Sequence, residues 1–360
     1  MKKVVAKFGG SSVRDANALR DCVRVVKDTA DLGVVVISAT YNTTNELEEL
    51  FSLLKKGEDE SALWGALKER HRIMARDLCC EEAFENLITT LEAELIQIRE
   101  NAELSYEHRD HLLSFGERIS SQLFAWVLSK EQNLPYQVEL LDATTVIKTD
   151  STYGMAFPQE ELILERVQLL KGRAQDNTLF VTQGFLGADS LGKRTTLGRE
   201  GSDYTATLLA GAFDAKEVHI WTDVDGVYTA DPHIIERARR LDTLSYREAT
   251  LLAKAGAKVL FPKTLAPLKE KKIPLRVGKT KAPQEGGTWV GGDHACSKDL
   301  IGLTLKERSD GLIITLIGHG VESLDIEQSE IDRGECYRSF YHPAKDIQDV
   351  LNLWYERYFS

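Results

Sequence analysis

The sequence has few cysteines, no excess of basic residues and no long apolar segment. Five scattered cysteines occur among its 360 residues and form no C-x-x-C pair: Cys22, Cys79, Cys80, Cys296 and Cys336. This pattern predicts neither a disulfide framework nor a zinc site. The net charge of -11 argues against nucleic acid or an anionic membrane as a partner, because both require a basic surface. No segment reaches the roughly 18 consecutive apolar residues of a membrane-spanning helix.

We expect no cleavable signal, and the sequence shows no internal repeat at a fixed period and no low-complexity tract. It enters a strand-like run, KKVVAKF, directly after the first residue. Its content of 42% hydrophobic and 28% charged residues is ordinary for a folded globular protein. Together with the scattered cysteines, these features favour a cytoplasmic protein.

Short runs rich in valine and isoleucine alternate with helical patterns along the chain. The apolar runs cover residues 4–8, 34–38, 179–183, 218–222 and 273–277, and the helical patterns include 16–29, 118–129 and 203–213. Continuous apolar strands separated by helices are typical of a parallel sheet covered on both faces. The sequence therefore predicts an α/β fold, a three-layer αβα sandwich with a mainly parallel sheet.

Two regions depart from this alternation. Between about residues 46 and 110 the periodicity is helical and charged, which indicates a helical insertion. After residue 292, the strand-like runs IGLTLKE, GLIITLIG and ECYRSFY precede an amphipathic helical pattern at 344–358. We therefore expect one large domain over residues 1–292 and a small α+β domain over 293–360.

The first apolar run ends in AKFGGSS and is followed by a helical pattern. Two glycines let backbone N–H groups approach an anion, a helix N-terminus adds partial positive charge, and Lys7 adds a full charge. This combination indicates a phosphate site. A tight strand-to-helix turn beside a lysine would explain the same residues without a ligand, and the local sequence leaves both interpretations open.

A second glycine-rich segment, GADSLGKRT, has the P-loop spacing G-x-x-x-x-G-K. Arg194 stands where a P-loop has its magnesium-binding Ser or Thr, and no helical pattern starts after the lysine. We expect a polar hairpin tip here instead.

The segment LGREGSD runs directly into the helical pattern YTATLLAGAF. Ser202 fits a helix cap, and Asp203 fits the first helical turn, where a carboxylate is favoured. A cap alone does not require Gly198, Arg199 and Gly201, and a guanidinium on a glycine-rich loop suits a carboxylate or a phosphate. A structural cap and a binding loop are both consistent with this segment.

Other candidate sites are incomplete. The D-x-D-G in WTDVDGVYTADP lacks the further carboxylates of a calcium loop, and no H-E-x-x-H motif occurs. The histidines show no triad or metal spacing, so we interpret them as structural or exposed and predict no metal ligands. Lys258 and Lys263 lie near another turn, and in so acidic a chain they could join Lys7 and Arg199 at one polyanion site.

Taken together, these segments resemble the amino acid kinase superfamily, and within it the aspartate kinase family. The matching segments, in family order, are KFGGSSV, VVISATYNTTN, LLSFGERISSQL, VTQGFLGADSLGKRTTLGREGSDYTATLLA, VHIWTDVDGVYTADP, GAKVLFPKTLAPLKEKKIPLRV and GGTWV. The likeness covers roughly residues 1–290. It implies an amino acid kinase catalytic domain over residues 1–292 and a reduced ACT-like domain over 293–360.

The resemblance also implies roles for particular residues. Lys7 and Asp203 would be catalytic, with Lys7 neutralising the transferring phosphate and Asp203 organising the transfer site. The implied substrate-binding residues are Ser38, Thr44, Glu117, Phe185, Arg199, Gly201 and Ser202. The implied nucleotide-binding residues are Lys7, Gly9, Gly10, Ser11, Thr222, Asp223, Tyr228, His233, Lys258 and Val259. Glu117 would hold the substrate ammonium and Arg199 its α-carboxylate.

The family resemblance implies ATP as co-substrate with Mg²⁺, L-aspartate as the phosphate acceptor, and a homodimer. Glu200, Asn42, Phe261 and His233 differ from the residues usual at these positions in the family. Glu200 matters most, because it adds a carboxylate near an anionic substrate. Three hypotheses follow: an aspartate kinase, a kinase of the same fold that acts on another amino acid or carboxylate, and a catalytically silent regulatory subunit.

The sequence after residue 292 generates a prediction about regulation. Aspartate kinases commonly carry two ACT domains, and about 65 residues hold only parts of one such unit. We therefore expect millimolar lysine or threonine to leave the initial rate nearly unchanged. Rates measured over a range of either amino acid test this, and a steep inhibition curve would contradict it.

Overall fold

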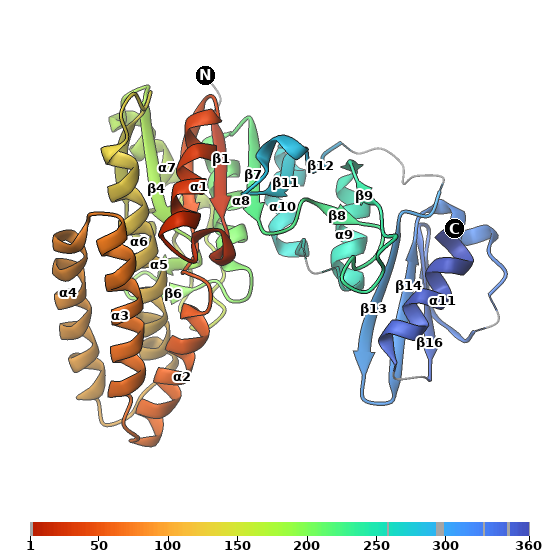
Figure 1. The fold of residues 1–360 in the computed structure, drawn as a ribbon, viewed down its shortest axis with the longest axis horizontal. Helices are drawn as coiled ribbons and strands as arrows, with labels where there is room; N and C mark the ends of the chain where they lie inside the picture. Colours follow the sequence, from red (N-terminus) through yellow and green to blue (C-terminus); the bar gives the residue numbers. More distant parts are fainter. Residues whose placement is uncertain (1–2, 258, 293–298, 327, 344–345, 360) are drawn as a thin grey trace. The chain divides into compact units, whose positions relative to one another are not determined.

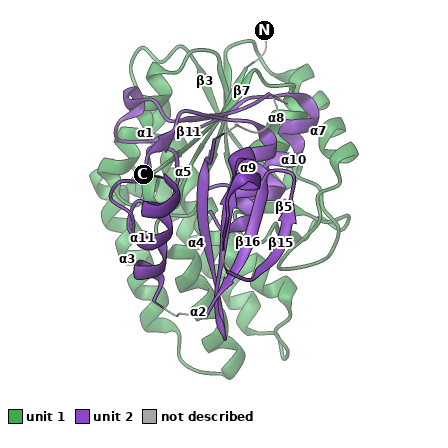
Figure 2. Ribbon diagram, turned by 90° about the vertical axis from the view of Figure 1, so that its right-hand side faces the viewer, with its two compact units in different colours: residues 1–223 green, residues 224–360 purple. Residues whose placement is uncertain are grey.

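The computed structural model describes residues 3–257, 259–292, 299–326, 328–343 and 346–359. Lys258 and Cys296, both considered above, lie outside these ranges. The chain divides into two compact units, Met1–Asp223 and Val224–Ser360, which Figure 2 colours separately.

The centre of unit 1 is a parallel sheet with strand order β7-β1-β2-β4-β3. Its strands are β1 (Val4–Phe8), β2 (Leu32–Ile37), β3 (Gln137–Leu141), β4 (Thr178–Gln183) and β7 (Glu217–Thr222). Four of them are the predicted apolar runs, extended by one or two residues at most. Because these strands are parallel and joined through helices, the predicted α/β class is confirmed (Figure 1).

Helices cover both faces of this sheet, as the alternation along β1 demonstrates. Val4, Ala6 and Phe8 belong to a hydrophobic cluster with residues of α1 (Ala16–Asp28) and α5 (Tyr106–Lys130). Lys7 points the other way and contacts α8 (Gly201–Phe213). Successive side chains of a strand face opposite sides of a sheet, so α1 and α5 lie on one face and α8 on the other.

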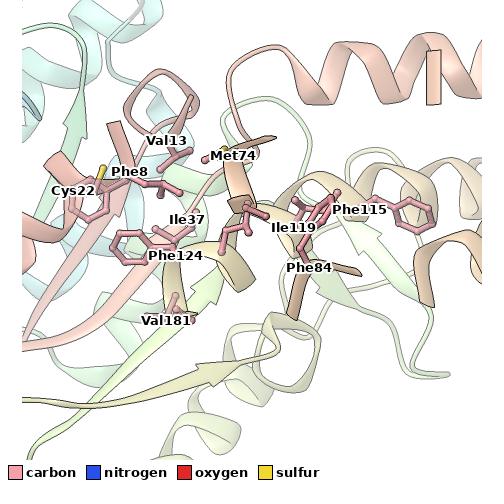
Figure 3. Close-up of a cluster of buried hydrophobic side chains, with 14 of the residues drawn as sticks. Phe8, Val13, Cys22, Ile37, Met74, Phe84, Phe115, Ile119, Phe124 and Val181 are labelled. Atoms are coloured by element: carbon pink, nitrogen blue, oxygen red, sulfur yellow. The ribbon is translucent and has the colours of Figure 1, made fainter. Parts of the chain in front are cut away.

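The predicted helical insertion is present as four helices in sequence. They are α2 (Thr43–Lys56), α3 (Ser61–Asp77), α4 (Glu81–Arg99) and α5, which continues to Lys130. One hydrophobic cluster runs from the sheet into this insertion (Figure 3). In it the ring of Phe8 in β1 lies 5.8 Å from that of Phe124 in α5, while Phe84 of α4 and Phe115 of α5 continue the cluster outward. The insertion therefore shares the core of the sheet.

The rest of unit 1 consists of shorter elements. They are η1 (Gly10–Val13), α6 (Ala143–Val146), α7 (Glu160–Arg173), β5 (Leu186–Ala188) and β6 (Arg194–Thr196). The strands β5 and β6 pair antiparallel, and Asp189 at the turn accepts backbone N–H bonds from Leu191 and Lys193. GADSLGKRT is therefore a hairpin, as predicted, and not a P-loop.

Unit 2 contains three α-helices and a four-stranded antiparallel sheet among its described residues, together with shorter strands. Its elements are β8 (Val227–Tyr228), β9 (Arg240–Leu241), β10 (Thr243–Leu244), α9 (Tyr246–Ala255), α10 (Pro262–Lys271), β11 (Leu275–Lys279), η2 (Pro283–Glu285), β12 (Thr288–Val290), β13 (Gly302–Arg308), β14 (Gly311–Ile317), η3 (His319–Ser323), β15 (Glu330–Gly334), β16 (Tyr337–His342) and α11 (Ile347–Phe359). Strands β13, β14, β16 and β15 form an antiparallel sheet in that order. The strands β10, β12 and β11 are hydrogen-bonded neighbours in that order, with β10 parallel and β11 antiparallel to β12, and β8 and β9 form a small ribbon.

The division after Asp223 lies earlier than the predicted domain boundary at residue 292. A physical reason is visible inside unit 2, where Ala230 and Ile235 share one hydrophobic cluster with Phe340 and Trp354. In addition, the Leu303 backbone N–H donates to the Thr229 carbonyl oxygen at 2.7 Å. Residues of the 229–238 segment are thus packed with the C-terminal sheet, a link that the linear sequence does not reveal. The boundary at 292 stays a prediction.

The strands missing from the sequence prediction include β3 and β15. Both β3 and β15 are largely uncovered, and β15 is exposed along most of its length. An exposed strand needs no apolar run, so the hydrophobic signal is absent. Within the described ranges, no helix is both long enough and apolar enough to cross a membrane.

Candidate active site

A cavity of about 590 Å³ opens in unit 1 beside the carboxyl ends of β1, β2 and β4. Open parallel sheets commonly bind ligands at this edge, where the loops that follow the strands meet. The predicted residues that line the cavity are Lys7, Gly10, Ser38, Thr44, Glu117, Phe185, Arg199, Gly201 and Ser202. Segments up to about 190 residues apart in the sequence thus share one surface.

Lys7 and Asp203 form a nearly buried ion pair at this cavity. The Lys7 Nζ lies 2.5 Å from the Asp203 Oδ1, and Lys7 and Asp203 keep only 7% and 5% of their surface exposed. Lys7 comes from the end of β1 and Asp203 from the first turn of α8. The pair therefore places a fixed positive charge where the strand end meets a helix N-terminus, which is a favourable place for an anion.

The glycine loop after β1 lies close to the loop after β2. A Cβ atom on Gly10 would lie 2.8 Å from the Ala39 carbonyl oxygen, and the Tyr41 backbone N–H donates to the Gly10 carbonyl oxygen at 3.0 Å. Glycine is therefore required at position 10 by close approach of another backbone. Gly9 and Ser11 belong to the same loop but do not line the cavity.

The helix after this loop, α1, begins at Ala16, as predicted, and the 3₁₀ turn η1 lies between the loop and the helix. The N-terminus of α1 is capped by Asp15, whose Oδ1 accepts the Ala18 backbone N–H at 2.8 Å. This carboxylate occupies one of the N–H donors of the helix N-terminus. The N-terminus of α8 lines the cavity, through Gly201 and Ser202.

Glu117 of α5 presents a buried carboxyl group to the cavity. It is 3% exposed, and among the described residues its Oε2 has no hydrogen-bond partner. Burial raises the pKa of Glu117 to about 8, although a backbone hydrogen bond from Ala39 and the charge of Lys7 oppose the shift. A buried carboxylate oxygen without a partner is unfavourable, so the Glu117 Oε2 suits a cationic group bound in the cavity.

The segment before α8 differs from the prediction in one respect. Ser202 was expected to cap the helix, but α8 begins at Gly201, so Glu200 occupies the cap position and makes no side-chain cap bond. Glu200 has a left-handed backbone, with φ of 57°, which costs a residue with a Cβ atom roughly 1–2 kcal/mol. Asp203 does lie in the first turn, as predicted.

Arg199 and Glu200 line the cavity side by side. The Arg199 Nε lies 3.7 Å from the Glu200 Oε1, and the Arg199 side chain is 82% exposed. Burial, and next the charge of Asp203, raise the pKa of Glu200, while Lys7 and Arg199 oppose the shift. The cavity thus holds carboxylates beside its cations, an arrangement suited to a ligand that carries both charges.

Sequence reasoning missed Asp110, a buried carboxylate that joins three segments. Its Oδ2 accepts backbone N–H groups of Gly154 and Thr196, each at 2.8 Å, and its Oδ1 accepts the Thr196 hydroxyl at 2.9 Å. Burial raises the pKa of Asp110 despite these donors. Gly154 itself lines the cavity, so Asp110 of α5 fixes part of the cavity wall. An aspartate within a helical pattern gives no sequence signal for this role.

His71 of the helical insertion supports the loop after β2. Its Nδ1 donates to the Leu67 carbonyl oxygen at 2.8 Å, so its Nε2 accepts the Thr40 hydroxyl at 2.7 Å. Thr40 in turn lies 2.6 Å from the Thr43 hydroxyl, next to the cavity residue Thr44. Full burial lowers the pKa of His71 to about 4, so it stays neutral at physiological pH. The prediction of a structural histidine agrees with this.

The predicted nucleotide-binding residues beyond the glycine loop fall in both units. Thr222 and Asp223 end unit 1, where the Thr222 hydroxyl donates to the Asp223 Oδ1 at 3.0 Å. In unit 2 the Tyr228 hydroxyl donates to Asp225 at 2.8 Å, the His233 backbone N–H donates to Asp231 at 3.0 Å, and Val259 is half-buried. Lys258 lies outside the described residues. These nucleotide assignments stay predictions.

A cluster that could hold a metal ion lies in unit 2, apart from the predicted site. The ligand atoms of His319, Glu335 and Cys336 lie within 4.8 Å of one another. Each group already has a protein partner, because Glu335 pairs with Arg247 and the Cys336 sulfur lies 3.7 Å from the His319 Nε2. The cluster is therefore satisfied without an ion.

The sequence of this chain matches a known protein family. The sequence profile described as the amino acid kinase family matches residues 2–279. The chain is 38% identical over 292 residues to lysine-sensitive aspartokinase 3 of Escherichia coli, and 36% identical over 287 residues to an aspartokinase of Chlamydia trachomatis. Each alignment covers 80% of this chain but 64% of the relative, so the chain spans less than two thirds of the length of these relatives.

A solved structure is similar over the whole chain. It is the E. coli aspartokinase III in complex with aspartate and ADP, with a TM-score of 0.85 and 25% identity over 100% of both chains. This likeness and the sheet described above agree on the fold.

The burial of Glu117 generates a prediction about pH and stability. Because its pKa is higher in the folded state than the ordinary 4.5, the folded protein binds this proton more tightly, and its stability falls as pH rises from about 4.5 to about 8. At about 1.4 kcal/mol per pKa unit, Glu117→Gln should gain a few kcal/mol over the parent at pH values above 8 and almost nothing near the lower end.

Urea unfolding of the parent and of Glu117→Gln at both ends of this pH range measures the difference. Glu165→Gln, at an exposed position on α7, controls for the loss of one charge. A gap between parent and Glu117→Gln that is the same at both pH values would contradict the burial argument.

Proposed function

The chain belongs to the amino acid kinase family, and from this premise we propose that it is an aspartate kinase. It transfers the γ-phosphoryl group of ATP to the β-carboxylate of L-aspartate, which gives 4-phospho-L-aspartate and ADP. This reaction is the first step in the biosynthesis of lysine, threonine and methionine.

The observation that carries the proposal is that a buried carboxyl group and an exposed guanidinium line one cavity. Glu117 offers a buried carboxyl oxygen without a partner among the described residues, and Arg199 offers an exposed guanidinium. An amino acid substrate carries both complementary groups, an ammonium for Glu117 and an α-carboxylate for Arg199. Ser38, Thr44, Phe185, Gly201 and Ser202 complete the proposed substrate surface.

The proposed chemistry needs no general base. The β-carboxylate of aspartate is an anion at neutral pH, since its ordinary pKa is about 3.9. One of its oxygens attacks the γ-phosphorus, the bond from that phosphorus to the β,γ-bridging oxygen breaks, and ADP leaves with the electron pair. Asp203 therefore acts by orienting Lys7, with which it is ion-paired, and does not accept a proton.

The main obstacle is repulsion between two anions. A carboxylate and a phosphate oxygen at ~4 Å repel by roughly 1–4 kcal/mol per pair of unit charges, depending on the local dielectric. We propose that Lys7, the N-terminus of α8 and Gly10, which line the cavity, offset this repulsion together with Gly9 and Ser11 of the same glycine loop. Catalysis is then mainly positioning and charge stabilisation.

The site fits ATP with Mg²⁺ on the chemistry of its donors. Lys7 suits a phosphate, and the Asp203 carboxylate beside it is the kind of oxygen ligand that Mg²⁺ prefers. When bound, Mg²⁺ would supply further neutralisation of the phosphate charge. Thr222, Asp223, Tyr228, His233, Lys258 and Val259 are the residues that we propose for the rest of the nucleotide.

Two alternatives to an aspartate kinase can be distinguished from it by experiment: a kinase with another acceptor and a silent regulatory subunit. Glu200 adds a carboxylate to the substrate side of the cavity, which favours testing other carboxylate acceptors. A silent regulatory subunit of the same fold would retain the fold without turnover. The homodimer expected from the resemblance stays a prediction.

ADP release with a panel of amino acids tests the proposed function. We expect turnover with L-aspartate and at least hundredfold lower kcat/KM with L-glutamate and L-asparagine, because a longer or neutral side chain misplaces or removes the attacking oxygen. A coupled assay for ADP measures each rate. Preference for another carboxylate would favour the second hypothesis, and no turnover with any acceptor would favour the silent subunit.

Replacement of Lys7 tests the proposed charge stabilisation. Lys7→Ala should lower kcat about 10²–10³-fold, because a fixed positive charge at the transferring phosphate is lost. The change also leaves Asp203 without its partner, so the double variant Lys7→Ala/Asp203→Asn controls for a buried unpaired charge. Thermal melts verify folding, and a folded Lys7→Ala with the parental kcat would remove Lys7 from the mechanism.

A further inference from the structure

Glu200 occupies a backbone position that does not favour it. Its φ of 57° lies in the left-handed region, where glycine fits without steric cost. Residues held in such conformations are found preferentially at functional sites, where the side chain is required for something other than local stability. The left-handed backbone therefore raises the question of what the Glu200 side chain does.

A structural role in α8 does not explain the side chain. Glu200 stands at the cap position, yet it makes no side-chain cap hydrogen bond to the helix. Its carboxylate lines the cavity instead, near the positive charges of Lys7 and Arg199 and the negative charge of Asp203. A negative group in an anion-binding cavity weakens the binding of an anion, so its presence there requires an explanation.

The geometry identifies Arg199 as the group that Glu200 engages. The Glu200 Oε1 lies 3.7 Å from the Arg199 Nε, within ion-pair distance. Arg199 is also the residue proposed to bind the α-carboxylate of the substrate, through the same guanidinium. Two carboxylates that share one guanidinium repel each other, so substrate binding must weaken or displace the internal pair.

We propose that Glu200 is a specificity-determining residue that competes with the substrate carboxylate for Arg199. In the empty site its carboxylate neutralises Arg199, and in the bound site it opposes any ligand that brings only negative charge. A ligand that also carries an ammonium has less net negative charge, so the Glu200 carboxylate repels it less. Glu200 thus lowers affinity for carboxylates in general and favours amino acids over simple dicarboxylates. The inference rests on the proposed function for the identity of the ligand.

Three variants separate charge from backbone effects. Glu200→Gln keeps the size and the left-handed backbone but removes the charge, and Glu200→Gly removes both the charge and the steric cost. Glu165→Gln, exposed on α7, controls for the change in net charge. Isothermal titration of the full chain with L-aspartate and, separately, with succinate gives the dissociation constants.

We expect Glu200→Gln and Glu200→Gly to bind L-aspartate roughly tenfold more tightly than the parent, as expected when a nearby like charge is removed from a partly solvated site. Succinate should gain more than aspartate, because it lacks the ammonium that offsets the repulsion. Glu165→Gln should match the parent for both ligands.

Each other outcome overturns the proposal in a recognisable way. Unchanged affinities would show that Glu200 does not compete for Arg199, and weaker binding in Glu200→Gln would make it a group that holds the ligand. Tightening in Glu200→Gly alone would assign the effect to the backbone. If neither the parent nor any variant binds L-aspartate, the proposed function fails. The succinate titration then still decides the role of Glu200 by the same criteria.

Discussion

The ion pair between Lys7 and Asp203 is the interaction on which the site depends. It joins the end of β1 to the first turn of α8 and keeps a positive charge nearly buried at the edge of the sheet. A lysine in such a place requires a partner, because an unpaired buried charge is strongly unfavourable. Asp203 provides that partner without occupying all the donors of the ammonium group, so Lys7 keeps donors for a phosphate.

Two buried residues of the helical insertion support the loops of the cavity. Asp110 binds the backbone of Gly154 and Thr196, and His71 binds the hydroxyl of Thr40. Both are buried and act on loops that line or adjoin the cavity. The insertion therefore does more than enlarge the core. It holds in place the loop after β2, the segment around Gly154 and the end of β6, which preorganises the cavity before a ligand arrives.

The cavity also carries costs in stability that point to function. Glu117 is buried with one carboxyl oxygen unpartnered among the described residues, and Glu200 has a left-handed backbone. Both features oppose folding, and neither is explained by packing. In our interpretation the substrate ammonium stabilises the first, and the second tunes the affinity of Arg199 for carboxylates. Natural proteins commonly keep such unfavourable features where binding or catalysis requires them.

Apolar periodicity and turn chemistry are local signals, so they were enough to predict the α/β class, the central strands, the helical insertion and the glycine-rich segments. The sequence also identified Lys7, Glu117 and Arg199 through the family resemblance. It could not place Asp110 or His71. Their partners in the cavity loops lie 31 (Thr40), 44 (Gly154) and 86 (Thr196) residues away in the chain, and their roles exist only once those partners are adjacent. Only the tertiary structure decided that Glu200, and not Ser202, precedes α8 with a left-handed backbone, and that residues near 230 pack with the C-terminal sheet. Those outcomes depend on which distant surfaces meet, and a linear pattern carries no such information.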